Sequence, residues 1–252
     1  MKKFLLFGLL ILTSACQTAT PSPAPSLFPT ATPPPSSPPP IPDTPTLEPT
    51  LTPEPTLTPL PRLFTNGFDS SLAGWVILQA GNDAVPNVST ENNTLRLQMD
   101  SPYTWLYILY GPFDYADVYI ETQFTNSALS PASTGLICRY SEENGWLEYN
   151  VNADGTYNVL YGRWLSVGIP DYLPVADGSS SEIKQSGETQ QIGMTCSGTT
   201  LQLYINQILI RNIDVSRFEF TNGKVGLTAS SYENAPVVVV FDSVTISESP
   251  SP

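Results

Sequence analysis

Histidine is absent from this chain, and other residues that commonly build catalytic or metal sites are scarce. Histidine is the most frequent general base in enzymes and a frequent zinc ligand, so its absence excludes Ser-His-Asp and Cys-His catalysis and the usual zinc sites. Only 10 Lys and Arg residues stand against 23 Asp and Glu residues, for a net charge of -13. Such an acidic chain is not attracted to nucleic acid or to anionic lipid surfaces. We therefore expect neither as a partner.

Long apolar runs are also rare, and the one at the N-terminus is too short to span a bilayer permanently. It covers residues 4–12, follows two lysines, and is followed by the small residues 13–15 and by Cys16. A short apolar run between a basic start and small residues is typical of a secretory signal peptide, here residues 1–15. We therefore expect the chain to be exported.

The end of this segment resembles the lipobox of bacterial lipoproteins. The tetrapeptide Thr13-Ser14-Ala15-Cys16 carries the resemblance, which implies cleavage before Cys16 and lipidation of its thiol. Thr13 stands where leucine is usual, so cleavage by the ordinary signal peptidase is the alternative. With the lipid attached, we expect an outward-facing protein on the cell membrane that contacts the bilayer through its lipid anchor only.

Proline is concentrated in one segment of the chain. Of the 26 prolines, 17 lie between residues 17 and 62, among many threonines. Proline has no backbone donor, and the segment has few large apolar side chains, so it cannot form a sheet or a core. We predict a disordered, extended Pro/Thr-rich tether over residues 16–62, partly in the polyproline II conformation.

The rest of the chain predicts one domain over residues 63–248 and a short tail at 249–252. Apolar residues alternate with period 2, turn residues recur at short intervals, and no segment has a helical period. We therefore predict an all-β fold, a jelly-roll β-sandwich of two antiparallel sheets. A continuously apolar strand is expected to be covered on both sides or to lie near the sandwich centre. The alternating segments are 94–99, 118–124, 201–205 and 225–229, and the continuously apolar one is 237–241.

Cys138 and Cys196 remain as one pair if Cys16 carries a lipid. In an oxidising compartment we expect this pair to form a disulfide. A catalytic thiol is not expected, because the chain contains no histidine to act as its base.

The order of several short motifs along the predicted domain is informative. They are Gly74-Trp75, Leu95-Arg96-Leu97, and residues 135–139, 146–149, 154–157, 201–206 and 223–227. This order resembles the concanavalin A-like lectin/glucanase superfamily, and more narrowly the laminin-G-like and 3-keto-disaccharide hydrolase type domains of exported bacterial lipoproteins. The resemblance implies a sandwich that binds or processes carbohydrate, and it implies a cysteine pair such as Cys138 and Cys196.

Aromatic residues are the main indication of a ligand. The predicted domain contains all 4 Trp and all 12 Tyr residues of the chain. Flat rings stack on the apolar faces of sugars, while amides, carboxylates and Arg bond the hydroxyls. Trp146 shares a strand face with the polar Glu148 and Asn150, so we expect this face to be exposed and to line a glycan site.

Two further residues complete the predicted site. Trp164 precedes a proline-containing loop and is expected at the rim of the sandwich. Arg139 is expected to form an ion pair with Glu148 across the sheet or to contact the ligand. Trp75 and Trp105 lie among aliphatic residues and are expected to pack in the core or at a sheet edge.

No cofactor is expected, with structural Ca²⁺ as the alternative. Such a site would join Asn66 and Asp69 near the first strand with Asp242 near the last, because the chain ends of a jelly roll often meet. Residues 150–155 resemble the opening of a calcium loop. Tyr161 stands where the bidentate Glu of that loop belongs, so we interpret this segment as a hairpin turn.

Three functions remain open from the sequence. The main hypothesis is a non-catalytic domain that binds cell-wall glycan or an external polysaccharide. A glycoside-active enzyme needs two carboxyl groups within about 10 Å of each other, and the chain lacks the Glu-x-Asp-x-x-Glu motif of laminarinase-type enzymes. The third function is a structural or protein-interaction module, which predicts an exposed apolar patch.

Overall fold

The computed structural model describes residues 59–69, 71–126 and 132–249. They belong to the second of the two units into which the chain divides, Thr56–Pro252. The predicted signal peptide, the lipidation of Cys16, the tether up to residue 58 and residues 250–252 of the tail lie outside the described residues.

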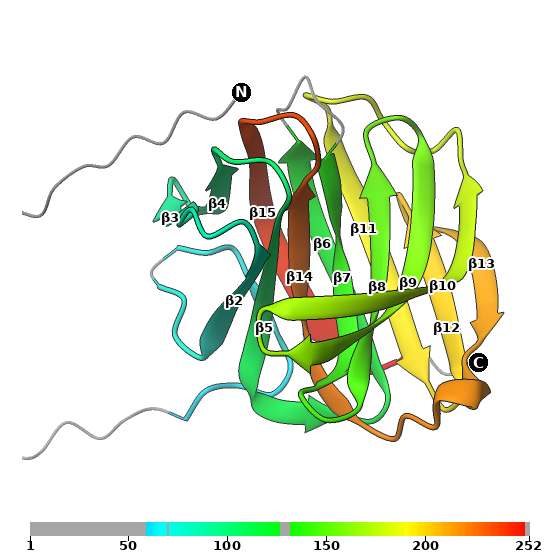
Figure 1. Ribbon diagram of the computed structural model, residues 1–252. Coiled ribbons are helices and arrows are strands. Elements are labelled where there is room, and N and C mark those ends of the chain that lie inside the picture. The colour runs from blue at the N-terminus through cyan, green and yellow to red at the C-terminus, as the bar shows by residue number, and fades with distance from the viewer. Residues whose placement is uncertain (1–58, 70, 127–131, 250–252) are drawn as a thin grey trace, which may run out of the picture. The chain divides into compact units, whose positions relative to one another are not determined.

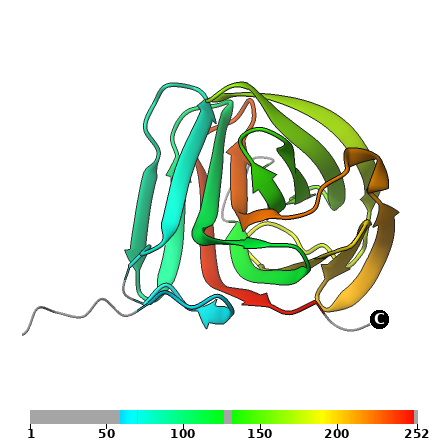
Figure 2. The same ribbon diagram turned by 90° about the horizontal axis from the view of Figure 1, so that it is seen from below.

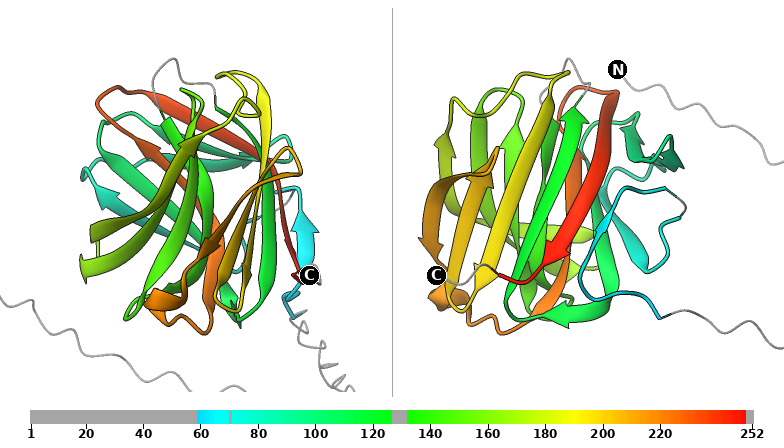
Figure 3. Two further views of the ribbon diagram at one scale, coloured as in Figure 1. Left: turned by 90° about the vertical axis from the view of Figure 1, so that its right-hand side faces the viewer. Right: turned by 180° about the vertical axis from the view of Figure 1, so that it is seen from behind.

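Two antiparallel sheets packed face to face form the domain (Figures 1 and 3). The front sheet faces the viewer in Figure 1 and has the strand order β10 (Ile169–Ser179), β9 (Thr156–Ser166), β8 (Gly145–Asn152), β7 (Ala132–Ser141), β14 (Gly223–Ser231), β5 (Thr104–Tyr115) and β2 (Trp75–Gly81). The rear sheet has the order β13 (Ile208–Asp214), β12 (Thr200–Ile205), β11 (Thr189–Ser197), β6 (Val118–Asn126), β15 (Val237–Ser247), β4 (Thr94–Met99) and β3 (Asn87–Glu91), with β1 (Phe64–Asn66) paired to β15. The predicted jelly-roll sandwich is confirmed.

Helical structure is almost absent from the described ranges. They contain only the single 3₁₀ turn η1 (Ser216–Phe218). No helix among these residues is long and apolar enough to cross a membrane.

The core lies between the two sheets, which curve around it (Figure 2). In β4, Leu95, Leu97 and Met99 are buried while the residues between them are half-buried, as the period-2 pattern predicts. A fully buried leucine side chain contributes about 1.5–3 kcal/mol to folding. Of the two expectations for residues 237–241, a central position is confirmed, because β15 lies between β6 and β4. Cover on both sides is wrong, because Val238 and Val240 are only half-buried.

A disulfide connects the sheets through the core. Cys138 on β7 and Cys196 on β11 are fully buried, and their sulfur atoms lie 2.01 Å apart. The predicted pairing is confirmed. The bond joins residues separated by 58 positions in the sequence, so it restrains a large part of the unfolded chain.

The β9–β10 hairpin bends across the outer face of the front sheet (Figure 1). The β9–β10 register shifts between Ile169 and Pro170 and between Pro174 and Ala176. Such irregularities bend a strand and increase its local twist. Both prolines lie on an edge strand, where the lack of an N–H does not weaken the sheet and discourages pairing with other chains.

A second apolar cluster, the covered cluster, fills the space between this hairpin and the sheet. It is separate from the core, and its large residues come from strands that are far apart in the sequence. Its buried members are Ala80, Tyr107, Leu109, Ile137, Tyr140 and Trp146, and Leu78, Trp105, Trp164 and Tyr172 pack against them.

We predict that the Cys138→Ser/Cys196→Ser variant loses about 4 kcal/mol of unfolding free energy, the chain-entropy value for a loop of this length. Urea denaturation of the oxidised parent and of the variant measures the difference. A loss below about 1 kcal/mol would show that the disulfide restrains the unfolded chain far less than its loop length implies.

Candidate functional site

The outer face of the front sheet is organised in rows, because paired residues on neighbouring antiparallel strands lie side by side. The register of β5, β14, β7, β8 and β9 aligns three such rows. The first row is Trp105, Ser230, Ser133, Asn152 and Thr156; the second is Tyr107, Thr228, Gly135, Asn150 and Asn158; the third is Leu109, Gly226, Ile137, Glu148 and Leu160.

The first two rows consist mainly of short or amide side chains, and we call them the polar lane. Its middle residues on β14 and β7 are buried, whereas Trp105, Asn152, Thr156 and Asn158 are half-buried toward its two ends. Hydrogen bonds run along the first row: Ser133 Oγ donates to Asn152 Oδ1 at 2.7 Å, and Asn152 Nδ2 donates to Thr156 Oγ1 at 2.9 Å. At its half-buried ends the polar lane therefore offers amide and hydroxyl groups on β8 and β9 and an indole ring on β5.

Glu148 lies in the third row and is only 3% exposed. Its Oε2 accepts from the indole of Trp146 at 3.0 Å and from the hydroxyl of Tyr172 at 3.2 Å. Its Oε1 accepts from Asn150 Nδ2 at 2.8 Å and from Thr228 Oγ1 at 3.5 Å. All four donors are neutral, and no cation among the described residues forms a salt bridge with this carboxyl group. Burial raises the pKa of Glu148, and the four hydrogen bonds offset only part of the increase.

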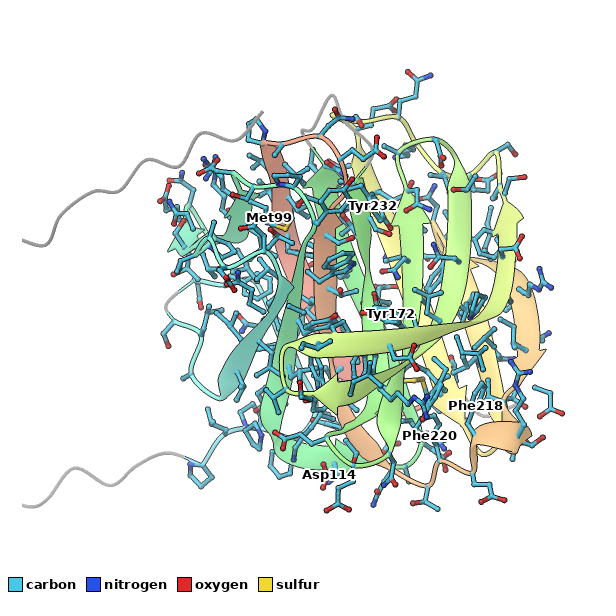
Figure 4. The ribbon with its side chains drawn as sticks, in the orientation of Figure 1. Met99, Asp114, Tyr172, Phe218, Phe220 and Tyr232 are labelled. Carbon is cyan, nitrogen blue, oxygen red and sulfur yellow. A yellow bond between two sulfur atoms is a disulfide. The ribbon has the colours of Figure 1, made fainter. Side chains whose placement is uncertain are left out.

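Tyr172 connects the hairpin to the sheet beneath it (Figure 4). Its hydroxyl lies 2.6 Å from that of Tyr107, and because Tyr172 donates to Glu148, Tyr107 is the donor in this pair. Burial, the larger cause, and the charge of Glu148, the smaller one, raise the pKa of both tyrosines. Both hydroxyls therefore stay protonated at neutral pH. The hydrogen bonds therefore form one chain in which Tyr107 donates to Tyr172 and Tyr172 donates to Glu148.

Trp146 is the centre of the covered cluster. Its ring lies 5.0 Å from that of Trp164, 5.4 Å from Tyr107 and 5.9 Å from Tyr172, measured between centroids. The neighbouring position on β9 is Gly162, where an added Cβ would lie 2.4 Å from the indole. Glycine at this position lets β9 pass close beside the tryptophan.

The expected exposure of Trp146, Glu148 and Asn150 is wrong. The structure brings the three residues together on one face of β8, as predicted, but they are 0%, 3% and 3% exposed. A polar strand face normally indicates contact with water, but here the β9–β10 hairpin and the neighbouring rows cover it. Trp146 therefore cannot stack on a sugar while the hairpin is in this position.

Trp164 and Arg139 also differ from expectation. Trp164 is not displayed at the rim; it lies half-buried on the side of the hairpin that packs against the covered cluster, and its indole donates to Tyr140 Oη at 2.9 Å. Arg139 does not pair with Glu148. It is buried, lies 4.0 Å from Asp117, and donates to the carbonyl oxygens of Phe220 and Ala116.

The calcium site expected at Asp69 and Asp242 stays a prediction, since it would combine only two carboxylates with the amide of Asn66. The described residues contain no group of three or more His, Cys, Asp or Glu side chains that could hold a metal ion. Asn66, the third expected ligand, accepts a hydrogen bond from the backbone N–H of Phe68 at 2.7 Å. The turn interpretation of residues 150–155 is confirmed, since Asp154 and Gly155 lie between β8 and β9.

Sequence reasoning missed the half-buried ends of the polar lane. Trp105 was assigned to packing alone, and it does pack against the covered cluster, but it remains half-buried. Asn152 and Asn158 flank the Asp-Gly turn and have no sequence signal that separates them from ordinary turn residues. The alternation of Trp105 and Tyr107 on one strand was the one available indication.

A surface hollow of about 680 Å³ lies elsewhere, at the end of the sandwich near Asp114 and Phe220 (Figure 4). Its wall includes the exposed Glu142 and Glu143, and its Lys224 is paired with Asp114 at 2.8 Å. None of the residues of the polar lane lines this hollow.

The sequence matches no family model and no curated protein. Solved structures are nevertheless similar in fold. A β-glucanase of Bacillus licheniformis has a TM-score of 0.54 at 12% identity over 74% of this chain and 98% of its own. A protein of unknown function with a galectin-like fold from Bacillus subtilis has a TM-score of 0.57 at 13% identity, over 74% of this chain and 95% of its own. The carbohydrate-binding module CBM66 of Bacillus subtilis has a TM-score of 0.52 at 16% identity, over 70% and 96%. The predicted concanavalin A-like fold is thus confirmed.

We predict that Gly162→Ala lowers the free energy of unfolding by about 1–3 kcal/mol, the usual range for overpacking, because the new methyl group overlaps the buried indole of Trp146. Gly67→Ala is the matched control, since nothing lies within 4 Å of a Cβ at that position. Urea denaturation measures both. Equal stability of the two variants would mean that β9 moves away from Trp146 at little energetic cost.

We predict that the stability difference between the parent and Glu148→Gln depends on pH. The pKa of Glu148 is raised in the folded state. Its contribution to the free energy of unfolding is therefore complete below the unfolded pKa of about 4.3 and is lost as pH rises through the folded-state pKa. The parent should therefore lose stability relative to the variant as pH rises from about 4 upward. Urea denaturation across this range measures the difference, with the exposed Glu143→Gln as control. A pH-independent difference would contradict the prediction.

Proposed function

We propose that this protein is a non-catalytic carbohydrate-binding domain and that a polysaccharide binds along the polar lane. The observation that carries the proposal is the register itself, which places a half-buried indole and two half-buried amides on the same face of the sheet, at opposite ends of the polar lane. Rings that stack on sugars beside hydrogen-bonding groups are the usual components of a glycan site.

The half-buried residues are the ones that contact the ligand in this proposal. Trp105 offers its ring at the β5 end of the polar lane, and Asn152 and Asn158 offer amides at the β9 end. Among the described residues, Asn158 Oδ1 accepts a hydrogen bond from Asn150 at 3.3 Å, while its Nδ2 donates none. This amide nitrogen is therefore available to a sugar hydroxyl.

The structural neighbours support a carbohydrate ligand, since they include a β-glucanase and a carbohydrate-binding module. The environment of Glu148 supports binding without catalysis. A glycosidase needs a pair of carboxyl groups that can reach the scissile bond. Both oxygens of Glu148 are occupied by structural hydrogen bonds under the hairpin, and its partners are neutral.

The location follows from the N-terminal residues. We place the domain outside the cell, joined through the Pro/Thr-rich tether to a lipid on Cys16. Sequences of this composition favour extended conformations, which would let the domain reach glycans beyond the membrane surface. Mass spectrometry of the membrane fraction, with Cys16→Ala as control, tests the anchor.

A protein-interaction role is the second candidate, because the outer surface of the hairpin is apolar. Leu165 and Val167 are 67% and 71% exposed, and Ile169 and Leu173 are also exposed. Exposed apolar groups gathered on one element are typical of a contact surface. This role becomes the preferred one if the folded protein binds no polysaccharide.

The proposed function is tested with a panel of soluble polysaccharides by affinity electrophoresis and calorimetry. We expect at least one polymer to bind the parent, and to bind Trp105→Ala at least about tenfold more weakly, as expected when a central aromatic contact is removed. Tyr204→Ala, on the rear sheet, is the matched control and should bind like the parent. Circular dichroism verifies that both variants are folded. Absence of binding across the panel would reject the proposal.

A further inference from the structure

We propose that the polar lane selects uncharged polysaccharides and discriminates against anionic ones, with the sugar chain lying across the strands. This inference rests on the proposed function and adds the chemical class of the ligand. The charges in and around the polar lane carry it.

The polar lane itself has no charged side chain. Its two rows contain Trp, Tyr, Ser, Thr, Gly and Asn only. Amides and hydroxyls donate and accept in equal measure, which suits the hydroxyl groups of a neutral sugar. A carboxylate or sulfate group has no donor capacity of its own and is best recognised by Arg or Lys.

The ionisable groups that border the polar lane are acidic. Asp177 is exposed on β10 directly beside Asn158, and Asp154 is exposed in the turn that follows Asn152. Asp154 Oδ1 accepts from Thr156 Oγ1 at 2.6 Å, and these hydrogen bonds lower the pKa of Asp154, so it is ionised at neutral pH. An anionic polymer on the polar lane would therefore approach like charges; Arg211 lies beside Asp177 and offsets part of its charge, whereas Asp154 forms no salt bridge among the described residues.

The basic residues of the front sheet are engaged elsewhere. Within the hairpin, Arg163 forms a salt bridge with Asp171 at 2.8 Å. Lys224 forms one with Asp114, and Arg139 is buried. Arg211, on the edge strand of the rear sheet, donates to the carbonyl of Asp177 at 2.8 Å and not to the polar lane. The remaining three basic residues of the domain are Arg96 on the rear sheet, Lys184 between β10 and β11, and Arg217 in η1.

The direction of the chain follows from the rows. They cross five strands, and neighbouring strands lie about 4.8 Å apart, so the polar lane is roughly 19 Å long. The bent hairpin crosses the sheet in the same general direction (Figure 1) and borders the third row with Tyr172. A sugar chain lying across the strands would thus contact Trp105 at one end and the amides at the other.

The test compares polymers that differ in charge. A neutral β-glucan, a polyuronate and a sulfated galactan are titrated into the purified protein at low and at physiological salt. We expect the neutral polymer to bind with little dependence on salt, and the two anionic polymers to bind at least about tenfold more weakly at physiological salt. Trp105→Ala should abolish most of the neutral binding.

A charge-adding variant makes the test sharper. Asn158→Lys should improve the binding of the polyuronate by about fivefold or more, whereas Gln123→Lys, which adds the same charge at an exposed position of β6, should not. Circular dichroism and urea denaturation verify the fold of both variants.

The outcomes are distinguishable. If no polymer binds, the proposed function fails. If a polyuronate or a sulfated galactan binds as well as the neutral glucan, and that binding depends on Trp105, the proposed function stands and the preference for uncharged over anionic chains is overturned.

Discussion

Trp146 packs against the backbone of Gly162, and the cover over the front sheet depends on this contact. A side chain at position 162 would collide with the indole, so only glycine lets β9 run past it at this distance. The bend of the β9–β10 hairpin then places Trp164 of β9 and Tyr172 of β10 on the same indole. The front sheet is consequently buried on both faces over much of β7 and β8, where nearly every residue is inaccessible.

The same cover determines the electrostatics of the face. It leaves Glu148 in a site without a cation, where neutral donors offset only part of the cost of losing water. The charged groups near the polar lane are exposed aspartates at its margin. In the proposed function, this surface selects ligands by ring stacking and hydrogen bonding, and any charge discrimination comes from repulsion.

The fold was largely predictable, and the site only in part. Burying one face of each strand imposes period 2, which is visible in Leu95, Leu97 and Met99 without any structure. Trp146 and Glu148 were correctly grouped on one face of a strand, but a local pattern cannot reveal that a distant hairpin covers this face. Arg139 escaped prediction for a different reason. It adopts a left-handed φ of 56° where the β7–β8 register shifts, and its side chain contacts Asp117.

By itself, the sequence determined the all-β class, the cysteine pair of the disulfide, and a chemistry without histidine and with few cations. These follow from composition and from short-range periodicity, because each depends on a residue and its near neighbours. Only the tertiary structure decided which polar residues form one lane and which aromatic rings are covered. Ser133, Asn152 and Ser230 become neighbours through strand register, and Trp146 is buried through the bend of a hairpin. Both depend on contacts between strands far apart in the chain, which no local pattern encodes.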